Sequence, residues 1–346
     1  MKVKTAIKGM IIFFSLLLAG LVSLLSYGLV KGTGELSAPG NGNWFSGAVL
    51  VNTQTFTLED ITDISVNNYS SDIFFLPSDD ETLVIKEYVS SRTRQNPFVT
   101  INRDGSRLRL ESDKYNTDSW LVFGNNYRCI EIYLPASYQN AVDIQTGSGD
   151  IFADMDLVFT DCLITGSSSD INLSKLTAET ISITTASGDL IARQLGGEKK
   201  IATQSGTVTI SGGSGNIEIS TSSGDIRLEA LTGDLSVSTS SGDLWVSDLT
   251  GSARARSSSG DMKIHFQSIT GNLDVESSSG TVYCELPKDA GFRFRADTGS
   301  GDIRTYFDDS LSFDRKGTQV EGEIGGPSDL QVTVKTSSGD IKFNGK

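Results

Sequence analysis

The sequence predicts an all-β protein: a β-solenoid of stacked coils, each about 18–20 residues long, behind an N-terminal transmembrane helix. Three observations support this fold class. A unit of nine residues that begins with Gly recurs from residue 215 to residue 286, apolar and polar residues alternate inside each unit, and no long stretch after residue 31 has helical periodicity. A fixed short period of this kind is the sequence signature of stacked repeats.

The alternation within a unit predicts a short strand with one buried face. Ile226 and Leu228 point to one side of the strand and Arg227 to the other, because successive strand residues face opposite ways. Leu235 and Val237 repeat the pattern in the next unit. One unit cannot bury its own apolar face, so neighbouring coils must stack on it. The Gly residues between strands fit turns, since Gly accepts a positive φ.

A corner signature, Ser-Gly-Asp or Ser-Gly-Thr, extends the repeat along the chain. Its third residue falls at Asp150, Asp170 (in a Ser-Ser-Asp variant), Asp189, Thr207, Asp225, Asp243, Asp261, Thr281, Asp302 and Asp340. The steps are 18 to 21 residues, except the last, which is 38 and corresponds to about two coils. We therefore expect coils with two main strands each, stacked in sequence order. The alternative is an ordinary β-sandwich, which would not need a repeated internal turn sequence.

The N-terminal segment predicts attachment to a membrane. Residues 1–8 are expected to be a cytoplasmic N-terminus, residues 9–30 a transmembrane helix and residues 31–48 a flexible linker rich in Gly. The run 9–30 is 22 uncharged residues, enough to span a bilayer. Lys2, Lys4 and Lys8 should stay cytoplasmic, which places the remainder outside the cell membrane. A cleaved signal peptide is the alternative; in both cases the bulk of the chain is extracytoplasmic.

The remaining segments should close the two ends of the solenoid. Residues 49–140 carry five less regular strand patterns, at 64–66, 71–75, 83–86, 107–110 and 130–134, and are predicted to form an N-terminal cap before a repeat domain at 141–346. Residues 115–126 and 306–327 are predicted loops. The chain ends soon after Phe343, so the final coil would expose a strand edge. A second copy of the chain, or the loop around Tyr306, could cover that edge.

The repeated pattern Ser/Thr-x-Ser-Gly-Asp-Ile/Leu over residues 141–346 follows a degenerate copy at Ser70-Ser71-Asp72-Ile73. In these features the chain resembles the bacterial putative-adhesin family of unknown function, over roughly residues 50–346. The resemblance implies a repetitive β-helical domain, often attached to a membrane or associated with envelope-stress systems. It implies no catalytic residues, because the family has no settled activity.

Composition narrows the range of partners and of redox chemistry. The net charge of −14 and the isoelectric point of about 4.6 disfavour nucleic acid, and no basic patch is clustered in the sequence. Cys129, Cys162 and Cys284 show no zinc-binding spacing. Cys284 falls on the inward alternation and should pack as a small apolar residue. One disulfide is compatible with the sequence but is not indicated by it.

The recurring corner Asp is the sharpest candidate site. Carboxylates stacked one per coil about 4.8 Å apart would repel each other by about 0.9 kcal/mol in water, and Ca²⁺ could bridge them. However, Thr207 and Thr281 interrupt the stack, and the Gly-Gly-x-Gly-x-Asp spacing of calcium-binding nonapeptides is absent. We favour a turn role, in which each Asp hydrogen-bonds nearby backbone. No metal site and no cofactor is predicted, with calcium kept as the alternative.

No catalytic residues are predicted. The single histidine, His265, lies on the outward alternation, where a Ser-His-Asp triad lacks partners. Arg227, Ser236, Trp245 and Lys263 are also outward, a mixed set with no pair of acids on adjacent coils. We therefore expect a membrane-anchored binding module for adhesion, scaffolding or envelope-stress sensing, with a cell-envelope glycan or protein as partner. The alternative is a carbohydrate-active β-helix that cleaves or binds polysaccharide.

Overall fold

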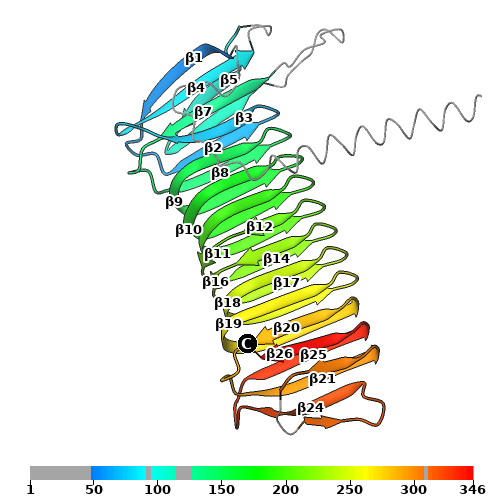
Figure 1. The fold of residues 1–346 in the computed structure, drawn as a ribbon. Coiled ribbons are helices and arrows are strands. Elements are labelled where there is room, and N and C mark those ends of the chain that lie inside the picture. The colour runs from blue at the N-terminus through cyan, green and yellow to red at the C-terminus, as the bar shows by residue number, and fades with distance from the viewer. Residues whose placement is uncertain (1–47, 91–94, 114–126, 308–310, 346) are drawn as a thin grey trace, which may run out of the picture. The chain divides into compact units, whose positions relative to one another are not determined.

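The computed structural model describes residues 48–90, 95–113, 127–307 and 311–345, which belong to one compact unit, Phe45–Lys346. Every regular element in these ranges is a β-strand (Figure 1), so the all-β prediction is confirmed for them. None of these residues forms a helix long and apolar enough to cross a membrane. The predicted transmembrane helix at 9–30, the cytoplasmic residues 1–8, the linker up to residue 47 and the loop at 115–126 lie outside the described residues.

The strands follow one another with short connections. The first eight are β1 (Ala48–Thr57), β2 (Asp63–Asn68), β3 (Asp72–Pro77), β4 (Thr82–Ser90), β5 (Val99–Asp104), β6 (Arg107–Ser112), β7 (Arg128–Leu134) and β8 (Ala141–Thr146). The next nine are β9 (Ile151–Gly166), β10 (Ile171–Thr185), β11 (Leu190–Thr203), β12 (Val208–Ile210), β13 (Gly213–Ser214), β14 (Ile217–Thr221), β15 (Ile226–Glu229), β16 (Leu231–Thr232) and β17 (Leu235–Thr239). The last nine are β18 (Leu244–Ser257), β19 (Met262–Ser279), β20 (Val282–Leu286), β21 (Phe292–Ser300), β22 (Ile303–Thr305), β23 (Leu311–Phe313), β24 (Gln319–Ile324), β25 (Gln331–Ser338) and β26 (Ile341–Gly345).

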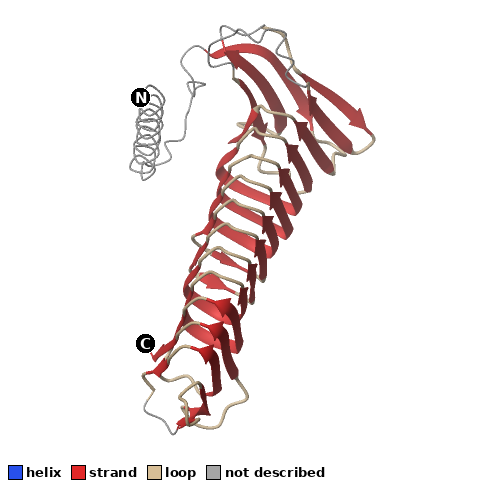
Figure 2. Ribbon diagram, turned by 90° about the vertical axis from the view of Figure 1, so that its right-hand side faces the viewer, coloured by secondary structure: helices blue, strands red, loops and turns tan. Residues whose placement is uncertain are grey.

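Successive coils pair in parallel and build two ladders of strands (Figure 2). The first ladder contains the strands that follow the Ser-Gly-Asp corner, such as β12, β15 and β20, and the second contains those after the opposite bend, such as β14 and β17. The long strands β9, β10, β11, β18 and β19 contribute to both ladders. Ile226 pairs with Leu244 and Ile171 with Leu190, which confirms coils of 18 and 19 residues and two main strands per coil.

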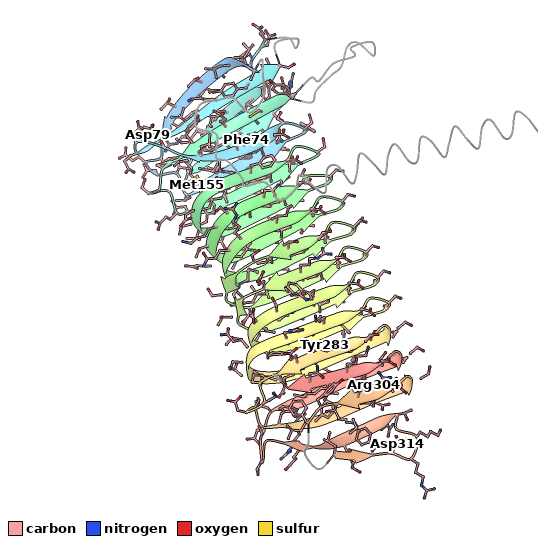
Figure 3. The ribbon with its side chains drawn as sticks, in the orientation of Figure 1. Phe74, Asp79, Met155, Tyr283, Arg304 and Asp314 are labelled. Carbon is pink, nitrogen blue, oxygen red and sulfur yellow. The ribbon has the colours of Figure 1, made fainter. Side chains whose placement is uncertain are left out.

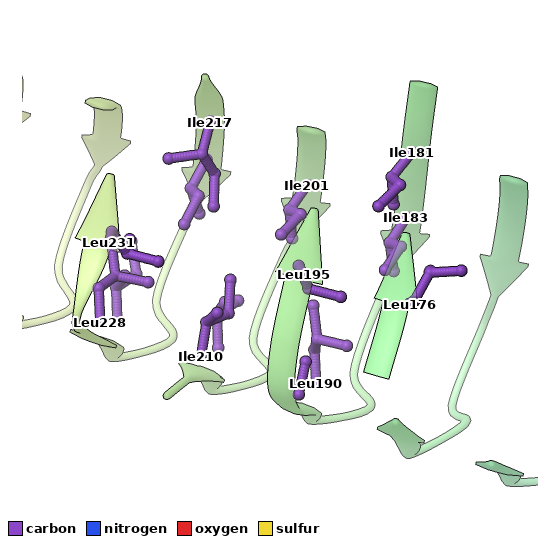
Figure 4. Packing of buried hydrophobic residues seen from close by; sticks show 14 of the residues in the cluster. Leu176, Ile181, Ile183, Leu190, Leu195, Ile201, Ile210, Ile217, Leu228 and Leu231 are labelled. Carbon is purple, nitrogen blue, oxygen red and sulfur yellow. The ribbon is translucent and has the colours of Figure 1, made fainter. Parts of the chain in front are cut away.

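The core fills the space between the two ladders. Ile226 and Leu228 are fully buried while Arg227 is exposed, and Leu235 is buried while Ser236 is exposed. Figure 4 shows Leu190, Ile210 and Leu228 facing this core together with residues of the second ladder. The alternation therefore predicted the inward and outward residues correctly. Cys284 is buried as expected, and all three cysteines are free thiols.

Glycine at the Ser-Gly-Asp corner is required for a reason that the sequence did not suggest. The backbone of Gly224 is not in the left-handed region, so a positive φ does not explain it. Instead, a Cβ on Gly224 would lie 1.9 Å from the carbonyl oxygen of Gly206, one coil away. Thr221 Oγ1 accepts the Gly224 N–H at 3.0 Å and holds the corner. Positive φ occurs at the opposite bend, for example 137° at Gly233.

The last coil of the chain is not the last coil of the stack. β25 pairs with β19 on one side and β21 on the other, and β26 lies between β20 and β22. In Figure 1 the red C-terminal strands lie between the yellow and orange ones. The expectation that the final coil forms the exposed end is therefore wrong. The step of 38 residues from Asp302 to Asp340 reflects an insertion, since the Ile341 N–H donates to the Asp302 carbonyl and the Val282 N–H to the Asp340 carbonyl.

Antiparallel strands cover the end beyond β21. β24 pairs antiparallel with β21, and β23 pairs antiparallel with β24. Residues 306–327 were predicted to be a loop, and this prediction is wrong for 311–313 and 319–324. Pairing with the free edge of β21 explains why 319–324 becomes a strand, and β24 in turn provides the edge on which 311–313 pairs.

The N-terminal end has the same arrangement. β2 lies between β6 and β8, and β3 between β7 and β9, so the first coil of the chain is also inserted. β4 and β5 then pair antiparallel with β7 and β6, and β1 pairs with β4. All five strands predicted in this region are present. The division into a cap at 49–140 and a repeat domain at 141–346 stays a prediction.

Leu235→Asp tests the inward assignment. It places a charge in a core position that is 2% exposed, and we expect the free energy of unfolding to fall by about 4 kcal/mol or more. The matched control is Ser236→Asp on the exposed side, which should change it by less than about 0.5 kcal/mol. Urea denaturation measures both, and equal stabilities would contradict the assignment.

Gly224→Ala tests the close approach at the corner. The new methyl group meets a backbone carbonyl that cannot rotate away, so we expect a loss of about 3 kcal/mol or more. Ser222→Ala, an exposed corner residue two positions earlier, is the control and should be nearly neutral. Thermal denaturation compares the two variants. Equal melting temperatures for Gly224→Ala and Ser222→Ala would show that the corner can widen at little cost in stability.

Candidate binding surface

A column of alternating aromatic and cationic side chains follows the outer face of the first ladder. Register pairs join its members, which contribute one residue per coil. In spatial order they are Arg227, Trp245, Lys263, Tyr283, Lys342 and Arg304. We refer to these six residues as the aromatic–cationic column. Figure 3 shows Tyr283 on β20 and Arg304 on β22, both strands of this ladder.

The two aromatic members of the column differ in exposure, since Trp245 is exposed and Tyr283 is half-buried beside a positive charge. Trp245 is 38% exposed, a large value for an indole in a folded chain. Lys263 Nζ lies 5.5 Å from the centroid of the Tyr283 ring, within the range of a cation–π contact. Tyr306, which follows β22, is 72% exposed and adds a third ring near the end of the ladder.

A cluster of hydrogen-bonding side chains lies next to Tyr283. The Tyr283 hydroxyl donates to Glu285 Oε2 at 2.9 Å, and Asn344 Nδ2 donates to the same hydroxyl at 2.8 Å. His265 Nδ1 is 3.6 Å from Glu285 Oε2, and its ring centroid is 5.4 Å from that of Tyr283. Burial, followed by the hydrogen bond to Glu285, raises the pKa of Tyr283, so the phenol stays neutral. His265 was predicted to face outward; its side chain is 23% exposed, packed into this cluster.

The corner Asp residues form hydrogen-bonded runs along the edge of the first ladder. The Asp243 N–H donates to Asp225 Oδ1 at 3.1 Å, the Asp261 N–H to Asp243 Oδ1 at 2.9 Å and the Thr281 N–H to Asp261 Oδ1 at 2.7 Å. Another run leads from Asp72 through three further Asp residues to Thr207. Each of these Asp residues accepts a backbone N–H, but the donor belongs to the next coil and not to the Asp's own turn, so the predicted turn role is wrong in its partner. A Thr ends each run because it contributes an N–H but no carboxylate.

The same carboxylates also neutralise part of the column. Asp225 pairs with Arg227 and Asp302 with Arg304, each at 3.1 Å. Burial raises the pKa of Asp72; the hydrogen bond from the Asp150 N–H opposes this effect, and the charge of Asp150 adds to it. Within the described ranges, no group of three or more His, Cys, Asp or Glu residues is placed to hold a metal ion.

The outer face of the second ladder carries a different surface. An open depression of about 630 Å³ there is lined by Lys200, Glu218, Ser236 and Arg254, among others. Lys200 pairs with Glu218 at 3.7 Å and Arg254 with Asp274 at 3.4 Å. These opposite charges neutralise each other across neighbouring coils, and the lining of the depression contains no aromatic ring. We therefore consider the first ladder the stronger candidate surface.

Comparison with known proteins identifies the family. The sequence model of a family described as "Toastrack DUF4097" matches residues 61–247 and 230–344, most of the chain. The chain belongs to the Toastrack family. This confirms the resemblance inferred from the Ser-Gly-Asp repeats. No curated protein matches the chain significantly.

Several solved structures resemble this Toastrack chain at low identity. A putative adhesin from Parabacteroides distasonis is 13% identical, covers 84% of this chain and 96% of its own, and has a TM-score of 0.33. A putative lipid binding protein from the same organism is 12% identical over 88% and 98%, with a TM-score of 0.33. A putative cell adhesion protein from Clostridium sporogenes is 12% identical over 85% and 98%, with a TM-score of 0.28.

Sequence reasoning found part of the candidate surface of this Toastrack chain. Arg227, Trp245 and Lys263 were assigned outward and are exposed. The contribution of Lys342 beside Tyr283 was missed, because it depends on the inserted last coil. The step of 38 residues was the available signal, since it showed that the last corner breaks the spacing.

The Toastrack core also contains a lysine that the alternation places inward. Lys199 is in register with Ile181 and Ile217 and is 4% exposed. Its Nζ donates to the carbonyl oxygens of Gly197 at 2.5 Å, Ser214 at 2.7 Å and Gly215 at 3.0 Å. The ammonium thereby closes the bend between two coils. Burial lowers its pKa to about 8, although the nearby charge of Glu198 opposes this effect.

The lowered pKa of Lys199 predicts a pH dependence of stability. Between about 8 and the ordinary 10.5, the unfolded chain binds a proton at this lysine that the folded chain has released, so the free energy of unfolding rises with pH. Urea denaturation at pH values within this window should show the rise in the free energy of unfolding, and Lys199→Met should remove it. Lys200→Met, on the exposed neighbour, is the control; the same pH slope in all three proteins would contradict the assignment.

Proposed function

We propose that this Toastrack chain is a non-catalytic binding module of the cell envelope, whose aromatic–cationic column binds an envelope glycan. The proposal places residues 49–346 outside the cell membrane, held there by the hydrophobic segment 9–30. Adhesion and scaffolding both use such a module directly, and envelope-stress sensing would add a signal to the same binding event.

The observation that carries the proposal is the alternation of rings and cations from Arg227 to Lys342 on the outer face of the first ladder. Trp245 and Tyr283 are two coils apart, which corresponds to about 10 Å at the usual strand spacing. A linear polymer with a repeating unit can therefore present a sugar ring to each aromatic in turn. Flat rings stack on the apolar faces of sugars, and the intervening charged groups hydrogen-bond hydroxyl groups.

The charge balance favours a neutral glycan over a polyanion. Arg227 and Arg304 are each paired with a corner Asp, and the chain carries a net charge of −14. A strongly anionic polymer would meet repulsion outside the column. Carboxylate and amide groups beside the rings, such as Glu285 and Asn344, match the hydroxyl groups of a neutral sugar instead. The adhesin and lipid-binding names belong to other proteins, and the proposal for this chain depends on its own surface.

Binding is preferred over cleavage for a chemical reason. Glycoside hydrolysis needs two carboxyl groups on either side of the scissile bond. The outward column presents rings and cations at these positions, and the corner Asp residues beside it accept backbone hydrogen bonds. The polysaccharide-cleaving β-helix therefore stays the alternative without a favouring observation.

Trp245→Ala tests the proposal. The full chain is applied to an array of cell-wall glycans and the affinity for each bound glycan is measured by titration. We expect Trp245→Ala to weaken binding at least tenfold, which corresponds to about 1.4 kcal/mol. The matched control, Ser236→Ala on the second ladder, should bind like the unaltered chain.

Two outcomes would contradict the proposal. Equal affinities of the Trp245→Ala and Ser236→Ala variants would exclude the column, and the absence of any bound glycan would exclude the ligand class. Release of reducing ends from a bound glycan would show instead that the chain cleaves polysaccharide.

A further inference from the structure

The C-terminal coil occupies a slot between two other coils. Parallel strands bound the slot on each side: β19 and β20 on one, β21 and β22 on the other. The coil inserted there, β25 and β26, is the last described part of the chain (Figure 1). Two neighbouring coils that are continuous in sequence thus form an acceptor that a later segment fills.

The slot accepts a generic coil of the repeat. The inserted corner reads Thr-Ser-Ser-Gly-Asp-Ile at 336–341, the same six residues as at 221–226. A Cβ on Gly339 would lie 2.1 Å from the Gly280 carbonyl oxygen, and one on Gly301 2.1 Å from the Gly339 carbonyl oxygen. These contacts repeat those between internal coils. Any coil with this repeated corner sequence therefore fits the slot, whether it comes from the same chain or from another copy.

The order of the last two coils is set by the strands beyond them. Residues 298–303 carry a related corner, Thr-Gly-Ser-Gly-Asp-Ile. The coil of β21 and β22 could therefore stack on β19 and β20 in the same way as the coil of β25 and β26. β24 pairs antiparallel with the outer edge of β21, which fixes β21 as the outermost coil strand. The slot is then filled by β25 and β26, which follow β24 in the sequence.

A short hinge connects the inserted coil to the rest of the chain. Residues 325–330 lead from β24 to β25, and Gly325 and Gly326 have φ values of 69° and 95°. A Cβ on Gly326 would have no neighbouring atom within 4 Å. Fully extended, six residues span up to about 20 Å. Gly325 lies close to the Ala290 carbonyl, and the Leu330 carbonyl accepts the Arg293 N–H at 2.8 Å. Directing the coil away from its own slot therefore breaks these hinge contacts, but no strand lies within residues 325–330.

We propose that two copies of this chain exchange their C-terminal coils, each placing residues 331–345 in the slot of the other. Val332, Val334, Ile341 and Phe343 are fully buried in the slot, and the exchanged dimer buries the same side chains against the same neighbours. The free energies of the closed and exchanged forms then differ mainly in the hinge and in the entropy of association, the usual condition for domain swapping. The occupant is a second copy because the chain itself carries the complementary corner sequence. An exchanged dimer would present two binding columns and raise the avidity for a polymer.

Cysteine pairs in register across the slot test the exchange. Glu276 on β19 pairs with Lys335 on β25, and neighbouring strands have Cα spacings that a disulfide can bridge. Full chains with Glu276→Cys and with Lys335→Cys, carrying different tags, are co-expressed and oxidised. We expect a disulfide between the two differently tagged chains, recovered by sequential purification on both tags.

The control pair is Ser220→Cys on one chain and Ser238→Cys on the other. These exposed residues are in register on β14 and β17, whose coils are continuous with the chain at both ends and should not exchange. We expect the yield of mixed disulfide to be at least tenfold lower for this pair.

A single chain with both Glu276→Cys and Lys335→Cys calibrates the geometry. Closure within that chain, together with no mixed disulfide between separate chains, would overturn the exchange. Equal yields for the 276/335 and 220/238 pairs would overturn it as well, since they would indicate random oxidation. If the single chain forms no disulfide between residues 276 and 335, the pairing of β25 with β19 is wrong, and the exchange that depends on it is overturned.

Discussion

The arrangement of the whole stack depends on the approach of one backbone to the next at the Ser-Gly-Asp corner. The carbonyl oxygen of each corner glycine lies where a side chain of the following glycine would be, 1.9 Å from the Cβ that Gly224 lacks. That approach sets the distance between coils and lets the corner Asp accept an N–H from its neighbour. Inward side chains then meet their counterparts at strand spacing, and the core follows from the corner.

The sequence predicted the local structure well because the signals are local. Alternation decides which side of a strand is buried, and Ile226, Leu228 and Leu235 are buried as expected. The corner motif gives the coil length. Lys199 is the instructive exception, since a charged residue at an inward position is tolerated only because three carbonyl oxygens of the bend surround its ammonium. Such a cage requires a bend geometry that the alternation does not specify.

The order of the coils was not predictable in the same way. All corners carry similar residues, so the motif cannot distinguish the coil at 302 from the coil at 340 as a neighbour of Thr281. The choice depends on antiparallel pairing between β21 and β24. β24 does alternate, with Val320 and Ile324 buried, but alternation does not specify which strand it pairs with. Sequence order and spatial order agree along the aromatic–cationic column from Arg227 to Tyr283, and the sequence analysis assigned Arg227, Trp245 and Lys263 outward. The column beyond Tyr283 depends on the insertion of β26.

The insertion of the first coil has a mechanical consequence. Tension entering at residue 48 would act first on β1, which pairs only with β4 along the described chain. That ribbon can unzip one hydrogen bond at a time. The next segment, β2 and β3, is held on both sides by parallel neighbours, so extracting it requires two rows of bonds to break together. A pull applied at residue 48 would thus first open the pairing of β1 with β4 and then be resisted by the two-sided pairing of β2 and β3.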